Sequence, residues 1–234
     1  MTVHVHLLPT MFEPSELRDG VAVMIDILRA STTVAAALEA GATAVRPHAA
    51  VADARLAATA EPGLLGGERG GVRIDGFDLG NSPGDYTAGA VSGRLLHFTT
   101  TNGTQALARM SAADEVLIGS FACRAALTRR LRDVTADVHL VCAGTDGRLT
   151  TEDIQFAGAV AGDLIKEPSA DQPLGTQLAV RLWRGTDDLL ASVRGGQGGR
   201  NLIALGMGED IARCLTEDTV TFVPRMRGDR IVRE

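Results

Sequence analysis

The feature that most constrains the fold is a repeated alternation of short apolar runs with alanine-rich stretches of helical character. Residues 21–28, VAVMIDIL, form an apolar run typical of a strand buried on both faces. Residues 33–40 follow with the composition of a helix, which Gly41 ends. The pattern returns later in the chain, with apolar runs at 94–100, 115–120 and 138–144 and a helical stretch at 124–133. This alternation predicts an α/β fold, a layered α/β/α arrangement with a largely parallel sheet.

Other segments complete this outline. We expect short strands at the N-terminus and at 44–47, and further helices at 51–60, 152–166 and 177–185. The helix at 152–166 has a threonine N-cap and acidic residues in its first turn, and Pro168 follows it. Two glycine-rich segments, 64–86 and 194–201, are the only low-complexity candidates, and apolar runs at 210–215 and 219–224 come last.

Chain length and hydrophobic content bound the domain organisation. With 234 residues and 45% hydrophobic content, the chain can bury one sizeable core. We therefore expect a single unit spanning 1–234. The alternative is a pair of α/β lobes, about 1–115 and 116–234, that share one active-site cleft.

Composition also excludes several functional classes. The formal net charge of −6 argues against a nucleic-acid footprint, which needs clustered basic residues. The sequence has no secretory leader pattern and no apolar run near the roughly 20 residues of a membrane helix, so a cytoplasmic protein without membrane contact is expected. Three widely spaced cysteines make disulfides and a structural zinc site improbable. For the oligomeric state, only the general frequency of homodimers offers a guide.

Three of the expected strand ends run into unusually polar turns. The first turn carries Asp26 and Arg29 before a run of hydroxyl residues, the second has the sequence TTTNGT at 99–104, and the third ends in Glu152 and Asp153. Taken singly, each turn is open to explanation as an ordinary helix cap. In a parallel sheet, however, the carboxyl ends of the strands share one edge, where ligands bind. The three turns together therefore predict a polar site.

The glycine-rich segment 64–86 has two interpretations. Seven glycines lie among charged residues in LLGGERGGVRIDGFDLGNSPGDY, which fits either a linker or a mobile lid over an anionic ligand. The polar turns favour a lid, because a charged site needs a cover that excludes water. We predict that Glu68 and Arg69 point into the site.

This inventory suits phosphoryl transfer. Carboxylates supply the hard oxygen ligands that Mg²⁺ prefers, and arginines beside helix starts hold phosphate oxygens. Water attack assisted by the metal and a phosphoenzyme formed on an aspartate both remain open.

Two other functions compete with this interpretation. Residues 142–148, CAGTDGR, formally match the C-x5-R pattern of thiolate phosphatases, with Cys142 as nucleophile. The apolar run before Cys142 favours a buried structural cysteine instead. A non-catalytic protein that binds a phosphorylated or sulfonated metabolite is the alternative from another class. The glycine pattern of P-loop nucleotide-binding proteins is absent.

Five blocks resemble one family when they are taken together. IDILRASTT, GGERGGVRIDGFDLGNSP, TTTNGTQAL, CAGTDGRLTTEDIQFAGA and the pair DIARCL and VP occur in this order over nearly the whole chain. In this respect the chain is similar to the 2-phosphosulfolactate phosphatase (ComB) family. The resemblance implies a Mg²⁺-dependent acid phosphatase that hydrolyses 2-phosphosulfolactate to sulfolactate and phosphate in coenzyme M biosynthesis. It also implies an α/β fold distinct from the common phosphatase superfamilies.

The family motifs carry the candidate site residues, and the division of roles among these residues is our own inference. Four residues are expected to act in catalysis: Asp26, Arg29, Glu68 and Arg69. Eight are expected to bind the small anionic phosphoester: Ser31, Thr32, Arg73, Asn81, Thr101, Asn102, Gly103 and Thr104. Four are expected to bind Mg²⁺: Asp26, Asp78, Glu152 and Asp153. The segment 194–201, RGGQGGRN, is richer in glycine than the family resemblance would lead us to expect.

Overall fold

The structure is a computed structural model that describes residues 1–165 and 171–233. Its strands are β1 (Val3–His6), β2 (Val21–Ile25), β3 (Ala44–Pro47), β4 (Leu64–Arg69), β5 (Val72–Arg73), β6 (Leu95–Thr99), β7 (Glu115–Gly119), β8 (Val138–Cys142), β9 (Pro224–Arg227) and β10 (Arg230–Arg233). Its α-helices are α1 (Ala30–Glu39), α2 (Val51–Ala60), α3 (Ala88–Val91), α4 (Gly103–Arg109), α5 (Arg124–Arg132), α6 (Thr151–Ile165), α7 (Leu174–Arg184), α8 (Leu189–Gly195), α9 (Gln197–Ala204) and α10 (Glu209–Leu215).

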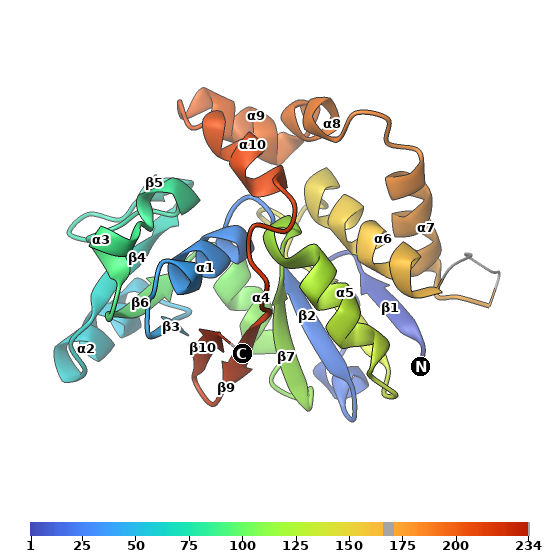
Figure 1. Cartoon of the computed structure of the whole chain (residues 1–234), viewed down its shortest axis with the longest axis horizontal. Coiled ribbons are helices and arrows are strands. Elements are labelled where there is room, and N and C mark those ends of the chain that lie inside the picture. Colours follow the sequence, from blue (N-terminus) through green and yellow to red (C-terminus); the bar gives the residue numbers. More distant parts are fainter. Residues whose placement is uncertain (166–170, 234) are drawn as a thin grey trace.

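The strands form one sheet in the order β1-β8-β2-β7-β9-β10-β3-β6-β4-β5. One half consists of β1, β8, β2 and β7, which are parallel, and the other contains the parallel set β3, β6 and β4. The C-terminal hairpin β9–β10 joins the halves through one antiparallel residue pair on each side, Leu117 with Arg225 and Ile231 with Val45. Figure 1 shows the halves set at an angle to each other, with the hairpin between them. The layered, largely parallel α/β fold expected from the sequence is confirmed.

Three antiparallel steps separate the halves, so their formal strand directions are opposite. In a flat sheet, the ends of β2 and β6 would then lie at opposite edges. They meet instead: a Cβ atom built on Gly103, at the start of the helix after β6, would lie 2.8 Å from Asp26 Oδ2, directly after β2. We attribute this convergence to the angle at the thinly paired hairpin, which turns both sets of strand ends toward one place.

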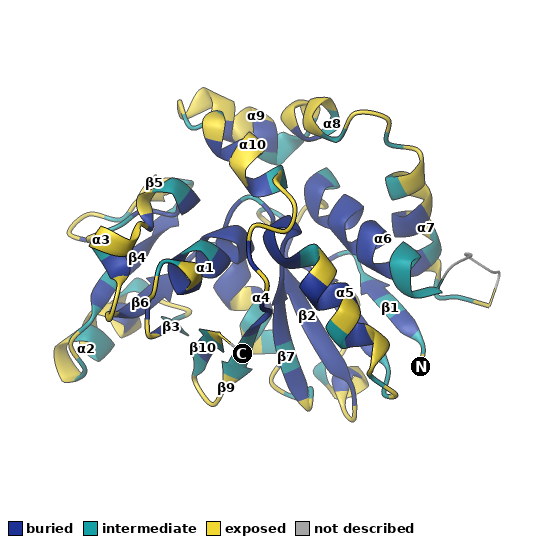
Figure 2. Cartoon of the chain, in the orientation of Figure 1, coloured by how far each residue is buried: buried dark blue, intermediate teal, exposed yellow. Residues whose placement is uncertain are grey.

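The sheet is covered on both faces, and strand β2, which is apolar at every position, contributes to the core on each side. Val23 and Ile25 pack in one core cluster with Phe121 and Phe156, whereas Met24 packs in another with Phe98. Alternate side chains of a strand point to opposite faces, so a continuous apolar run supplies both cores. Figure 2 accordingly shows β2 and β7 buried along nearly their whole length.

Helices α8, α9 and α10 form a cap above the carboxyl ends of β2 and β8 (Figure 1). A small cluster of Val193, Leu202 and Ile211 holds the three helices together, and Leu28, two residues after Asp26, packs against it. The cap therefore stands directly over the first polar turn.

Most predicted elements are present within a few residues of their expected limits, although the first long strand ends at Ile25 instead of residue 28. The glycine-rich segments are the main correction. The first contains β4 and β5, and the second is helical, as the end of α8 and the first half of α9. Lys166 and Pro168, the predicted end of the helix at 152–166, lie outside the described residues.

The sequence does not predict the hairpin β9–β10. Strands β1 and β2 of the first expected lobe pair with β8 and β7 of the second, and the domain division itself stays a prediction. In the part of the chain that the structure describes, no helix is both long and apolar enough to cross a membrane.

Candidate active site

A cavity of about 340 Å³ lies where the polar turns meet the cap. Its walls come from six parts of the chain: the turn after β2, the β4–β5 hairpin, the segment near Asn81, the turn after β6, the turn after β8, and helix α9. Six of the predicted site residues line it: Asp26, Arg29, Glu68, Asn81, Thr101 and Asn102. Sequence motifs from Asp26 to Asp146 thus meet around one space.

Asp26 stands at the floor of this cavity, where β2 ends. The turn that follows is closed by Ser31, whose hydroxyl accepts a hydrogen bond from Asp26 N at 2.7 Å, while Ser31 N donates to Asp26 O at 2.9 Å. Burial and the nearby carboxylates of Asp153 and Glu68 raise the pKa of Asp26 well above its usual range. A proton or a cation at this carboxylate would relieve that repulsion.

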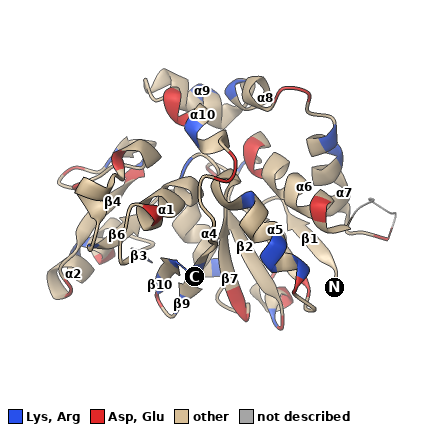
Figure 3. Ribbon diagram, viewed as in Figure 1, with Lys and Arg blue, Asp and Glu red and all other residues tan. Residues whose placement is uncertain are grey.

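Asp153 connects the ends of strands β2 and β8 through hydrogen bonds to the backbone. Its Oδ1 accepts from Ile27 N at 2.8 Å and its Oδ2 from Gly144 N at 3.0 Å, so one carboxylate ties the turn after β2 to the turn after β8. Burial raises its pKa to about 6, opposed by these backbone hydrogen bonds. Figure 3 shows the acidic first turn of α6 at the end of the helix that points toward the cap.

Glu152 is buried beside Asp153 and faces the start of α9. Within the described part of the chain, its Oε2 has no hydrogen-bond partner, and burial followed by the charge of Asp153 raises its pKa to about 8. A Cβ atom on Gly198 would press against Glu152 Oε1, so a larger residue at that position of the cap would force the Glu152 carboxylate to move. The glycines of the 194–201 segment thus allow the cap to approach the acidic helix start.

Glu68 joins the hairpin to the turn after β6. Its Oε1 accepts from Thr101 N at 2.7 Å, and its Oε2 accepts from Gly71 N at 2.7 Å and from Thr101 Oγ1 at 3.2 Å. The next residue on the strand points the other way, as the pleat requires. Arg69 donates to Thr99 Oγ1 and Ala49 O, away from the cavity, so the expectation that it joins Glu68 in the site is not met.

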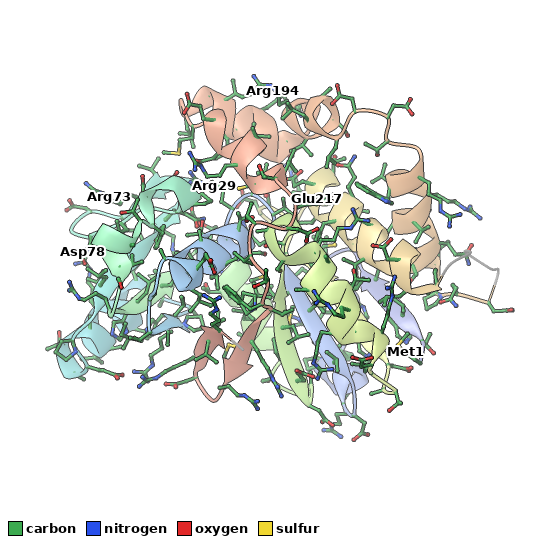
Figure 4. All side chains as sticks on the ribbon, viewed as in Figure 1. Met1, Arg29, Arg73, Asp78, Arg194 and Glu217 are labelled. Atoms are coloured by element: carbon green, nitrogen blue, oxygen red, sulfur yellow. The ribbon has the colours of Figure 1, made fainter. Side chains whose placement is uncertain are left out.

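Arg29 lies between the hairpin and the cap, and Figure 4 shows it beneath α10. Only 2% of its side chain is exposed. Its Nη1 donates to Asp210 Oδ2 at 2.7 Å and to Met207 Sδ at 3.0 Å, and its Nη2 donates to Gly71 O at 2.8 Å. The peptide bond that precedes it, Leu28–Arg29, is cis.

Two asparagines complete the polar wall. Asn102 Oδ1 accepts from Asp146 N at 3.1 Å and so links the turns after β6 and β8. Asn81 is held through its main chain, since Thr33 Oγ1 donates to Asn81 O at 2.8 Å, while its buried Oδ1 has no hydrogen-bond partner among the residues that the structure describes. A buried amide oxygen without a donor calls for a ligand, a water molecule or a cation.

Four predicted ligand-binding residues support the site without lining it. Besides Ser31, Thr104 Oγ1 donates to the carbonyl of Thr100, the hydroxyl of Thr32 is directed at Ile27 O, and Gly103 lies behind Asp26. Arg73 and Asp78 line a second hollow on the other side of Arg29 (Figure 4), and Asp78 caps the start of β4 by accepting from Leu65 N. The main cavity is therefore lined neither by the four supporting residues nor by Arg73 and Asp78.

The predicted metal ligands do not gather as a set of four, because Asp78 lies apart from the other three. Within residues 1–165 and 171–233, no group of three or more His, Cys, Asp or Glu side chains is arranged to hold a metal ion. The cavity itself offers Asp26, Asn81 Oδ1 and Glu68 as oxygen donors. This set fits the manner in which Mg²⁺ binds, through one or two carboxylates plus water and phosphate oxygens.

Cys142 is unsuited to nucleophilic attack. It is fully buried in β8, and burial together with Asp153 and Glu152 raises its pKa well above the usual thiol range. Residues 145–148 form a tight turn with positive φ at Asp146 and Gly147, and no loop that encircles an anion is formed. The C-x5-R match is therefore a coincidence of spacing.

Sequence reasoning missed the contribution of the cap. Asp210, Met207, Asn201 and Leu205 border the cavity or hold Arg29, yet none belongs to a polar turn after a strand. The short block DIARCL, which begins at Asp210, was the one signal in the sequence that pointed to this region.

Comparisons with known proteins identify the family of the chain. The sequence model of the 2-phosphosulpholactate phosphatase family matches residues 6–229. A protein of Symbiobacterium thermophilum named "Probable 2-phosphosulfolactate phosphatase" is 40% identical, with 93% of this chain and 95% of the relative covered. Proteins of the same name from a Synechocystis species and from Deinococcus radiodurans are each 36% identical, with 96% and 97% of this chain and 96% and 93% of the relatives covered. The chain belongs to the 2-phosphosulpholactate phosphatase family.

Proposed function

We propose that this protein is a phosphoric monoester hydrolase that releases phosphate from 2-phosphosulfolactate or a similar small anionic phosphoester in the presence of Mg²⁺. The observation that carries the proposal is the cavity at the joined strand ends, lined by Asp26, Arg29 and Glu68. These residues belong to the motifs on which the family resemblance rests. The name that the family and its members carry supports the choice of substrate.

The charge of the cavity supports a role for a divalent cation. Three carboxylates line it, those of Asp26, Glu68 and Asp146, against the single guanidinium of Arg29, which is already paired with Asp210. A phosphate ester that also carries sulfonate and carboxylate groups would meet net repulsion there. Mg²⁺ would supply the missing positive charge and polarise the phosphoryl oxygens. Asp26 and the free Oδ1 of Asn81 are the residues we expect to hold it.

The protein groups have separate tasks in this proposal. Arg29 binds phosphoryl oxygens, and Glu68 fixes the backbone of Gly71 and Thr101 around the ligand. Asp26 acts either as the base for an attacking water or as the nucleophile itself. Two measurements separate the routes. In single turnover in ¹⁸O-labelled water, label in the carboxylate of Asp26 would exclude direct water attack, whereas labelled phosphate arises by either route when water attacks phosphorus. Borohydride reduction during turnover would then trap an aspartyl phosphate at Asp26 if a phosphoenzyme forms.

A phosphate-release assay over a panel of sulfonated and carboxylated phosphoesters, with Mg²⁺ or with EDTA, tests the proposal. We expect release that requires Mg²⁺ and that is fastest with 2-phosphosulfolactate. Full activity in EDTA would overturn the metal requirement. Stabilisation by the phosphoesters without any phosphate release would identify a binding protein instead.

Two further expectations accompany the proposal. A cytoplasmic location agrees with three cysteines that are free and buried, as thiols are in reducing compartments. A homodimer is expected only from the general frequency of such assemblies. Cell fractionation and light scattering of the purified chain check the two.

A further inference from the structure

A buried ion pair links the cap helix α10 to Arg29 of the candidate site. Asp210, in the first turn of α10, has its Oδ2 2.7 Å from Arg29 Nη1, and only 2% and 9% of the two side chains are exposed. The other oxygen, Oδ1, accepts a hydrogen bond from Ser82 Oγ at 2.7 Å. The carboxylate of Asp210 is thus held on one side by the segment after the hairpin and itself holds Arg29 on the other.

The donors of Arg29 can be counted. A guanidinium has five N–H donors, and three of those of Arg29 go to Asp210, Met207 and Gly71. Within the described residues, two donors then remain for a ligand, which is the number that a bidentate contact to one oxyanion uses. The protein bonds fix the plane of the guanidinium, so they also fix the direction of these two donors.

Without Asp210, Arg29 would keep only two neutral partners, which hold its guanidinium less strongly than a charged one does. Met207 offers only a thioether, and Gly71 lies in the two-residue connection of the β4–β5 hairpin with a φ of 82°. A charged partner that is buried and itself anchored by Ser82 is the strongest of the three contacts.

We propose that Asp210 is a positioning residue for oxyanion binding, acting through Arg29 from the cap helix α10. This role depends on the proposed function in one respect: the phosphate group of the ligand must contact Arg29. It also means that the cap takes part in binding by orienting this arginine. Neither the sequence motifs nor the family name assigns Asp210 such a role.

A double-mutant cycle tests the proposal with inorganic phosphate as the probe. Phosphate affinity is measured by calorimetry, with Mg²⁺ present, for the full-length protein and for Asp210→Ala, Arg29→Gln and the double variant. We expect Asp210→Ala to weaken phosphate binding about tenfold, and to change it less than about threefold when Arg29 is already Gln. Asp210→Asn keeps an acceptor for Arg29 and a donor for Ser82, so it should restore affinity to within about threefold of the parent.

Two controls separate positioning from a general effect on folding. Asp163→Asn removes the charge from a different Arg–Asp pair, 3.0 Å from Arg124 and away from the cavity, and should leave phosphate affinity unchanged. Should Asp210→Ala fail to fold, Ser82→Ala replaces it, with an expected loss of a few-fold that again depends on Arg29.

An equal loss in both Arg29 backgrounds, or unchanged affinity in Asp210→Ala, would overturn the proposal. The proposed function fails separately. If the parent protein binds phosphate and shows the expected coupling but hydrolyses no phosphoester, the enzymatic function is wrong and the role of Asp210 stands.

Discussion

Substitution of Glu68 by Gln tests whether the glycine-rich segment builds the site. Both carboxylate oxygens accept a backbone N–H, from Thr101 and Gly71, at 2.7 Å each. Gln offers one oxygen and one NH₂ group, so one of these N–H donors loses its acceptor and the other hydrogen bond loses its charge. An unpaired buried donor costs about 1–3 kcal/mol and the lost charge assistance about 1 kcal/mol, which gives a total of about 2–4 kcal/mol.

The neighbouring residue supplies a matched control. Arg69→Ala leaves the Glu68 carboxylate and its two backbone partners in place. It removes hydrogen bonds to Thr99 Oγ1, Ala49 O and the main-chain carbonyl of Glu68, at a cost of about 1–3 kcal/mol. Urea unfolding gives both free energies. In the phosphate-release assay, we expect Glu68→Gln to lower kcat/KM at least about tenfold, because the backbone around the ligand is no longer fixed, and Arg69→Ala to leave it within about threefold.

The comparison of the two variants is decisive. If both leave turnover intact, the segment 64–86 only connects other elements. If Arg69→Ala reduces turnover as much as Glu68→Gln does, the assignment of the two side chains to opposite faces is wrong.

Three further predictions concern other parts of the molecule. Cys142→Ser should keep the activity of the parent in the phosphate-release assay, and loss of activity without loss of fold would revive the thiolate mechanism. Gly198→Ala should lower the melting temperature and the turnover, because its Cβ would press against Glu152 Oε1 and overpacking costs about 1–3 kcal/mol. An unchanged melting temperature and turnover would contradict the close contact between the cap and Glu152. Burial, followed by the charges of His139 and His4, lowers the pKa of His6 from 6.5 to about 4. Between pH 6.5 and pH 4, the unfolded chain therefore binds more protons at His6 than the folded protein does. Stability is therefore full above pH 6.5 and falls by at most about 3 kcal/mol as the pH drops to 4; urea titrations that show the same fall in His6→Gln would contradict this cause.

Apolar runs and strand-end chemistry carry enough information to predict half of the site. The run 21–25 is apolar at every position, so its burial on both faces and the placement of Asp26 after it follow from the sequence. The same holds for the acidic start of α6. What the sequence does not contain is the angle between the two halves of the sheet, which depends on the C-terminal hairpin β9–β10.

The glycine-rich strand β4 shows why local preference fails here. Glycine disfavours strands, so Gly66 and Gly67 predict a loop. In the structure, a Cβ atom on Gly66 would lie 2.6 Å from the Tyr86 hydroxyl, and one on Gly67, where φ is 133°, would lie 1.9 Å from Thr99 O. These two positions therefore require glycine because neighbouring atoms leave no room for a Cβ atom, and a need for a flexible backbone is not the reason. Recognition of the strand would also have placed Glu68 and Arg69 on opposite faces.

The role of the cap is the other part that the sequence conceals. Asp210 is 181 residues from Arg29 in the chain, and an aspartate at the start of a helix is ordinarily explained by the helix dipole. Only the tertiary arrangement brings the two side chains together.

The most direct test of the central claim, that the cavity around Asp26 is the active site of a phosphatase, is phosphate release from 2-phosphosulfolactate by the parent protein and by Asp26→Asn. The account predicts release by the parent that stops on addition of EDTA, and no release above background by Asp26→Asn, with the fold of the variant intact by circular dichroism. Turnover by Asp26→Asn at the rate of the parent would contradict it.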